Sequence, residues 1–208
     1  MTESVLKKIH LLGHSSLRID AGKIIYIDPF ELPADAVKAD IVLITHEHYD
    51  HYSAVDLEII ATPATHVVTI ASVAGQIALE HVHTVKPGDT ITVEGIEIEA
   101  VLAYNVNKKF HPRTAGHVGY IVTVDGKRIY HAGDTDLIPE MADFDVDIAV
   151  LPVSGTYVMT AEEAIEAAER IAPEIAVPMH YGSIVGDISD AEQFVAGCTM
   201  KTAILPKE

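Results

Sequence analysis

The sequence predicts a single domain of the α/β class, a four-layer αββα sandwich in which two β-sheets pack face to face under outer helices. Three observations predict this fold. Strand-like segments fill both halves of the chain, helix-like segments are interspersed among them, and residues 41–44 form a continuous apolar run of the kind buried on both faces of a sheet. No linker, repeat or low-complexity tract divides the 208 residues, so we expect one domain over residues 1–208.

Apolar periodicity and Gly/Pro positions assign the elements of the first half. We expect strands at residues 6–12, 16–20, 24–27, 41–44 and 67–70. Tight turns at 13–14 and 21–22 make the first three strands antiparallel. Helices are expected at 53–60 and at 72–80, the second with Ser72 as its N-cap.

The second half begins with two expected hairpins. Strands 90–94 and 97–102 flank Gly95, and strands 118–124 and 127–131 flank the turn pair Asp125-Gly126. Strands at 147–151, 174–178 and 202–205 then alternate with helices at 160–171 and 190–196. Loops at one edge of such sheets bring distant residues together, so the strand ends are where we look for a site.

Composition and charge exclude several classes of function. Apolar residues make up 49% and charged residues 22% of the chain, which is typical of globular proteins and not of disordered or coiled-coil ones. The 31 acidic residues against 14 Lys and Arg give a net charge of -17, which disfavours nucleic-acid binding. No apolar run is long enough for membrane insertion. The N-terminus lacks a signal-peptide pattern, so we expect a cytoplasmic protein.

A dense run of metal-binding residue types follows the apolar run 41–44. His46, His48, Asp50 and His51 lie within six residues. His46 and His48 point to the same side of an extended segment, and imidazole and carboxylate are good ligands for Zn, Fe or Mn. The single cysteine, Cys198, excludes a thiolate-rich site. The run therefore predicts a metal centre, with two ligands available to each of two ions.

Two further candidates lie where other strands end. Asp134 follows Gly133 after strand 127–131, where its carboxylate could bridge two ions. His180 follows strand 174–178, where it could be a terminal ligand. Each is weak alone, since an Asp after Gly is usually a turn residue and a lone His usually makes a structural hydrogen bond.

The chain resembles the metallo-β-lactamase superfamily, and within it the small branch of hydrolases like ascorbate-phosphate lactonase and N-acylphosphatidylethanolamine phospholipase. The segments that carry the resemblance run in family order over nearly the full length: Gly13-His14-Ser15, Ile27-Asp28-Pro29-Phe30, Thr45-His46-Glu47-His48-Tyr49-Asp50-His51, His131-Ala132-Gly133-Asp134-Thr135 and Pro178-Met179-His180-Tyr181-Gly182. The HxHxDH segment and the Gly133-Asp134-Thr135 element are together specific to this superfamily.

The resemblance implies a four-layer metallo-β-lactamase fold and two divalent metal ions, with zinc preferred over Mn or Fe. It implies that His46 and His48 bind the first ion and that Asp50 and His51 bind the second. Asp134 would bridge the two ions, and His180 would complete the ligand set of the second ion. Asp50 and Asp134 would thus take part directly in catalysis.

The family's third histidine for the first ion is not settled by the sequence. The position where it is first sought holds Asn105, a much weaker ligand than imidazole. We favour His111, in a segment whose backbone is fixed by Pro112, and keep Asn105 and His117 as alternatives.

Asp28 and His14 are expected outside the ligand set. Asp28 could accept an N–H from a metal-bound imidazole or be an ordinary Asp-Pro turn residue. His14 could line the pocket and donate a proton in catalysis, although a structural role is favoured. The remaining histidines are expected to bind no metal: His10, His66, His81, His83 and His131.

The function implied is metal-dependent hydrolysis of an ester-type bond, such as a phosphodiester or lactone, by a metal-activated water. No Gly-x-Ser-x-Gly, Walker or dinucleotide motif offers another chemistry. The alternatives are a non-catalytic metal-binding or regulatory module and a di-iron oxidoreductase, which in this superfamily typically has a Glu where this chain has His48.

The expected partner is a small-molecule substrate, and the sequence leaves its charge open. The pocket rim is expected at residues 105–113 and 156–160. Lys108, Lys109 and Arg113 in the first segment would suit an anionic, phosphate-bearing substrate, although a solvated basic loop is the more ordinary explanation. Homo-oligomers are common among enzymes, and the sequence leaves open whether this chain forms one.

Overall fold

Two β-sheets form the centre of the molecule, in a computed structural model that describes residues 1–208. The first sheet has six strands in sequence order: β1 (Ile9–Gly13), β2 (Ser16–Asp20), β3 (Ile24–Ile27), β4 (Ile41–Ile44), β5 (His66–Thr69) and β6 (His81–Thr84). The second has seven, in the order β13 (Lys201–Thr202), β12 (Ile175–Met179), β11 (Ile148–Pro152), β10 (Lys127–His131), β9 (Val118–Val124), β8 (Ile96–Leu102) and β7 (Thr90–Val93).

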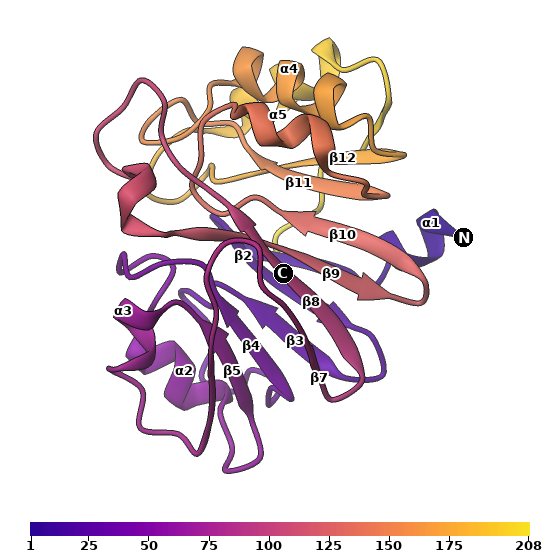
Figure 1. Cartoon of the computed structure of the whole chain (residues 1–208). Helices are drawn as coiled ribbons and strands as arrows, with labels where there is room; N and C mark the ends of the chain where they lie inside the picture. Colours follow the sequence, from indigo (N-terminus) through magenta and orange to yellow (C-terminus); the bar gives the residue numbers. More distant parts are fainter.

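Helices cover the outer face of each sheet, as Figure 1 shows. α4 (Ala161–Ile171) and α5 (Ile188–Gly197) lie beyond β11 and β12, whereas α2 (Ala54–Ile60) and α3 (Ala71–Ala74) lie beside β4 and β5. The short α1 (Thr2–Leu6) and the 3-10 helices η1 (Arg113–Ala115) and η2 (Pro139–Asp143) complete the chain. The predicted four-layer αββα fold is therefore confirmed. None of these helices is both long and apolar enough to cross a membrane.

Parallel strands bring the ends of both sheets to one edge of the sandwich. β3 to β6 pair in parallel in the first sheet, and β10 to β13 do so in the second. β4, β11 and β12 are buried along their whole length because helices cover one face and the other sheet covers the opposite face. The loops that follow β4, β10 and β12 therefore emerge near one another.

Local structure differs from the sequence prediction in several places. The helix expected at 72–80 is a single turn at Ala71–Ala74, because Gly75 ends it and the chain must return to pair β6 with β5. Ser72 is not its N-cap; its hydroxyl donates to the Glu47 carboxylate instead. The first strand starts at Ile9 after α1, and the last is only Lys201–Thr202.

Two glycines let the Asp134 turn approach the neighbouring chain closely. A Cβ on Gly119, in β9, would lie 2.8 Å from the carbonyl oxygens of both His131 and Ala132. Gly133 has a φ of 61°, and a Cβ there would lie 2.9 Å from the Val118 carbonyl oxygen. Both positions require glycine, so the close packing of β9 against this turn fixes where Asp134 lies.

We predict that Gly119→Ala destabilises the protein by about 1–3 kcal/mol, because the clash is with backbone rather than with a flexible side chain. Urea unfolding monitored by circular dichroism measures the change. Gly75→Ala is the control, since its Cβ would meet nothing closer than 4.0 Å and its φ is an ordinary helical one. Equal stabilities for the two variants would contradict the role assigned to the Gly119 contact.

Candidate metal centre

The segment after β4 folds into a compact turn that gathers its four candidate ligands. The backbone N–H groups of His51 and Tyr52 both donate to the His48 carbonyl oxygen, at 2.9 and 2.8 Å. This turn reverses the chain, so that Asp50 and His51 point back toward the end of β4. His46 and His51 are fully buried.

Three imidazoles form a first cluster. His48 Nδ1 lies 3.1 Å from His46 Nε2 and 3.2 Å from His111 Nε2. Nitrogen atoms held at about 2.0–2.1 Å from one tetrahedral ion would be about 3.3 Å apart. The separations fit one shared ion, and the structure places His111, rather than Asn105 or His117, in this cluster.

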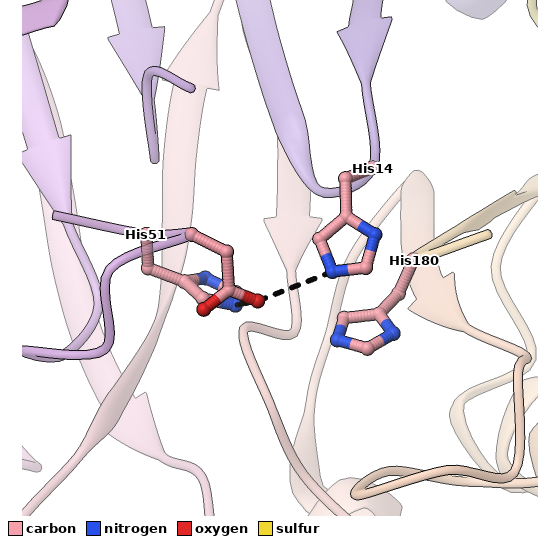
Figure 2. A group of neighbouring side chains, drawn as sticks. His14, His51 and His180 are labelled. Carbon is pink, nitrogen blue, oxygen red and sulfur yellow. Dashed lines mark ion pairs between the residues drawn. The ribbon is translucent and has the colours of Figure 1, made fainter. Parts of the chain in front are cut away.

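A second cluster joins His14, Asp50, His51 and His180. His14 Nε2 is 3.2 Å and His51 Nε2 is 3.6 Å from Asp50 Oδ2. Figure 2 shows the imidazoles of His14, His51 and His180 converging from three separate elements. His14 was predicted to lie outside the ligand set. In the structure its Nε2 is at least as close to Asp50 Oδ2 as that of the predicted ligand His51.

Asp134 lies between the two clusters. Its Oδ1 is 3.1 Å from His51 Nε2, and its Oδ2 is 3.3 Å from His111 Nε2 and 3.4 Å from His180 Nε2. One carboxylate therefore contacts imidazoles of both clusters, which is the position that a bridging ligand would occupy.

Unpartnered atoms show that these residues fit metal ions. The buried atoms His51 Nε2, His180 Nε2 and Asp134 Oδ1 have no hydrogen-bond partner in the protein. They lie close together but are not aligned as donors and acceptors. Buried polar atoms are normally satisfied, and cations bound among these nitrogen and oxygen atoms would satisfy them.

Buried groups behind the clusters orient the imidazoles. Asp28 accepts hydrogen bonds from Thr45 N at 2.8 Å and from Thr45 Oγ1 at 2.7 Å, and its Oδ2 lies 2.7 Å from His51 Nδ1. Thr45 Oγ1 is also 2.9 Å from His46 Nδ1. Asp28 is therefore a partner of a candidate ligand, as one of the two sequence interpretations proposed.

The second half of the chain supplies equivalent partners. Asn105 Oδ1 accepts a hydrogen bond from His111 N at 2.9 Å and lies 3.2 Å from His111 Nδ1, so Asn105 orients His111. Ser154 Oγ lies 2.9 Å from His180 Nδ1. The sequence interpretation missed Ser154, for which the only signal is its position just after β11.

His117 lies beside the first cluster without joining it. Its ring stacks on that of His46 with 4.8 Å between centroids, and its Nε2 is 3.4 Å from Glu47. His131 Nε2 donates to the Ser15 carbonyl oxygen, 2.8 Å away, and its Nδ1 accepts from Gly133 N, so both ring nitrogens have protein partners.

The protonation states of the buried site residues favour cation binding. Burial lowers the pKa of His46 well below its ordinary value and lowers the pKa of His111 to about 4, which keeps both imidazoles neutral. Burial opposes the charged forms of His51 and Asp134, but their mutual attraction, with Asp28 and His180, raises the pKa of His51 and lowers the pKa of Asp134. A cation at His51 would replace that proton.

Three of the site residues have left-handed backbone conformations. The φ angles are 49° at His14, 49° at Asp28 and 63° at His180. Such conformations are unfavourable for residues other than glycine and persist where surrounding contacts impose them. Here the His180 N–H donates to the His14 carbonyl oxygen at 2.7 Å, which joins two of these residues across the two sheets.

Comparisons with known proteins identify the family of the chain. The β-lactamase superfamily domain matches residues 8–180. A UPF0173 metal-dependent hydrolase of Thermococcus kodakarensis is 34% identical over 203 residues, with 90% of each chain covered. One from Methanopyrus kandleri is 35% identical over 207 residues, covering 90% of this chain and 89% of its own.

Solved structures agree as well. A metal-dependent hydrolase structure from Parabacteroides distasonis has a TM-score of 0.83 and 37% identity, covering 94% of this chain and 91% of its own. Igni18, a metallo hydrolase from Ignicoccus hospitalis, has a TM-score of 0.77 and 27% identity, covering 96% and 94%. The chain therefore belongs to the β-lactamase superfamily and, within it, to the UPF0173 metal-dependent hydrolases.

Proposed function

We propose that this hydrolase uses two divalent ions to cleave an ester-type bond of a small molecule. The observation that carries the proposal is the position of Asp134, whose carboxylate contacts imidazoles of both clusters. His46, His48 and His111 would hold one ion. Asp50, His51 and His180 would hold the other, with Asp134 shared between them.

Two such ions would supply a water nucleophile at neutral pH and positive charge opposite the oxygen that becomes negative during hydrolysis. Imidazole and carboxylate donors suit zinc, and they also accept manganese or iron. No cysteine competes as the nucleophile. The only cysteine, Cys198, lies outside the site, and burial together with Glu169 raises the pKa of its thiol to about 11.

The protein's own residues orient this machinery. Asp28 holds His51 through Nδ1, so that Nε2 points into the site. His14 Nε2 faces the Asp50 carboxylate at 3.2 Å, and burial lowers the pKa of His14, which favours its neutral form. A neutral imidazole in this position can accept a proton at Nε2 or hold Asp50 in place.

We predict that Asp134→Ala abolishes hydrolysis of a panel of carboxylic esters, lactones and phosphodiesters, because it removes the carboxylate shared by both clusters. Metal content per chain, measured by inductively coupled plasma mass spectrometry, should fall as well. Asp147→Asn is the control, since that carboxylate only accepts bonds from Lys127 and Arg128. Hydrolysis that survives in a folded Asp134→Ala protein would refute the proposed mechanism.

We also predict that Asp28→Asn weakens metal binding by about 10- to 100-fold, because the amide cannot accept all three hydrogen bonds that the carboxylate accepts. Competition with a chromogenic chelator measures the affinity. The same Asp147→Asn control should bind metal like the unmodified protein. If Asp28→Asn retained full affinity, Asp28 would have no part in orienting His51.

A further inference from the structure

The entrance to the metal centre has an apolar, largely aromatic wall. A cavity of about 280 Å³ lies directly over His48, Asp50, His111 and Asp134. Its remaining lining comes from Tyr49, Phe110, Tyr157 and Ile184. A substrate whose reacting bond reaches the candidate ligands must therefore place the rest of its structure against these four side chains.

The aromatic side chains of this wall are unusually exposed for apolar groups. Tyr49 is 65% exposed, Phe110 52% and Tyr157 39%. Exposed apolar surface is unfavourable in water, and when it gathers beside a functional site it commonly marks the surface that a ligand covers. The wall is therefore suited to an apolar group, which would gain by displacing water from it.

Contacts with other aromatic side chains hold the rings of this wall in fixed positions. Phe110 and Tyr157 make an edge-to-face pair with centroids 4.5 Å apart, and Tyr49 packs edge-to-face on Phe30 at 6.0 Å. A flat ring entering the cavity would meet the aromatic side chains of Tyr49, Phe110 and Tyr157, which line it. Such contacts favour an aryl group over a flexible polar chain.

One residue links this wall to the metal centre. Asn105 Nδ2 donates to the Tyr157 carbonyl oxygen at 2.9 Å, while Asn105 Oδ1 accepts from His111 N. Tyr157 has a left-handed φ of 70°, a strained conformation that this contact helps to hold. The aromatic wall therefore has a fixed position relative to His111.

Charge in the cavity opposes an anionic ligand. None of the residues that line it is a lysine or arginine. Among the three cations of this rim, Lys108 lies 2.7 Å from Asp136 and 3.4 Å from Glu163, and Arg113 lies 2.9 Å from Glu140. The third, Lys109, does not line the cavity. The metal ions would be the only positive charges in contact with substrate, and they would face the reacting bond.

We infer that the substrate is an uncharged ester or lactone with an aryl or comparably flat apolar group beside the reacting carbonyl. The inference rests on the proposed hydrolytic function. In the reaction, the oxygen of water bonds to the carbonyl carbon and the bond from that carbon to the leaving oxygen breaks. One proton of water goes to the leaving oxygen and the other is released to solvent, giving a carboxylate and an alcohol or phenol.

Steady-state hydrolysis by the metal-loaded protein tests the inference with phenyl acetate and its 4-sulfonate, which share the same reacting bond and differ in ring charge. We expect a lower KM for phenyl acetate. Phe110→Ala and Tyr157→Ala should each raise that KM roughly 3- to 10-fold, with kcat little changed, because each removes one aromatic contact. Val55→Ala, which removes an exposed apolar side chain on α2, is the control.

Binding of acetanilide, the amide counterpart of phenyl acetate, tests the wall without relying on turnover. We expect saturable binding to the metal-loaded protein, weakened by Phe110→Ala and Tyr157→Ala but not by Val55→Ala. Metal content and circular dichroism establish that each variant retains the site and the fold. The inference would be overturned if Phe110→Ala and Tyr157→Ala both left the affinity for acetanilide unchanged. It would also be overturned if the 4-sulfonate of acetanilide bound more tightly than acetanilide.

The two measurements separate the failure of this inference from that of the proposed function. A protein that binds acetanilide through the wall but hydrolyses no ester would contradict the proposed hydrolysis while supporting an aryl-binding cavity. A protein that hydrolyses phenyl acetate with unchanged KM in both wall variants would support hydrolysis and contradict the aryl-binding cavity.

Discussion

The carboxylate of Asp28 is the contact on which the rest of the site depends. It is fully buried at the end of β3 and receives two hydrogen bonds from Thr45, the first residue after β4. Those bonds fix the direction in which the chain leaves β4, and the contact with His51 fixes the same segment where it returns. A buried carboxylate is costly unless it is fully hydrogen-bonded, so this arrangement tolerates little displacement. The left-handed conformation of Asp28 is part of the cost of holding it there.

The parts of the site that could be predicted from sequence are those set by short-range patterns. The spacing of His46, His48, Asp50 and His51 after an apolar strand is sufficient to indicate metal binding, because a strand end followed by a turn constrains all four. His111 was harder to assign because it lies in a long loop between β8 and β9. Its position depends on its hydrogen bond with Asn105, and Asn105 is in turn held by Asp136, 31 residues away. Contacts of that kind leave no periodic pattern in the sequence.

The errors in secondary structure have a similar origin. Residues 72–80 have the local composition of a helix, but pairing of β6 with β5 requires the chain to turn back after Ala74. Sheet formation between segments distant in sequence therefore outweighs local helix propensity there. The hairpin around Asp125-Gly126 was predicted well because its turn residues specify it locally.

Most of the chain's 14 Lys and Arg side chains make ion pairs with its more numerous acidic residues. Lys127 contacts Asp147 and Glu174, Lys23 contacts Asp40 and Glu94, and Arg128 contacts Glu99. Exposed pairs of this kind add little stability individually. Their collective effect is that the surface has little uncompensated positive charge, so attraction for a developing negative charge must come from the metal centre itself.

The division of the proposed ligands between the two sheets gives the metal centre a mechanical role. His46, His48, Asp50 and His51 follow a strand of the first sheet, whereas Asp134 and His180 follow strands of the second. Ions bound by both groups would act as a cross-link between the halves of the sandwich, which the chain itself connects through the short segment between β6 and β7. Metal binding would then hold the two sheets together at the edge where these ligands lie. At the opposite edge the two sheets are joined instead by the ion pairs Lys8–Asp125 and Lys23–Glu94.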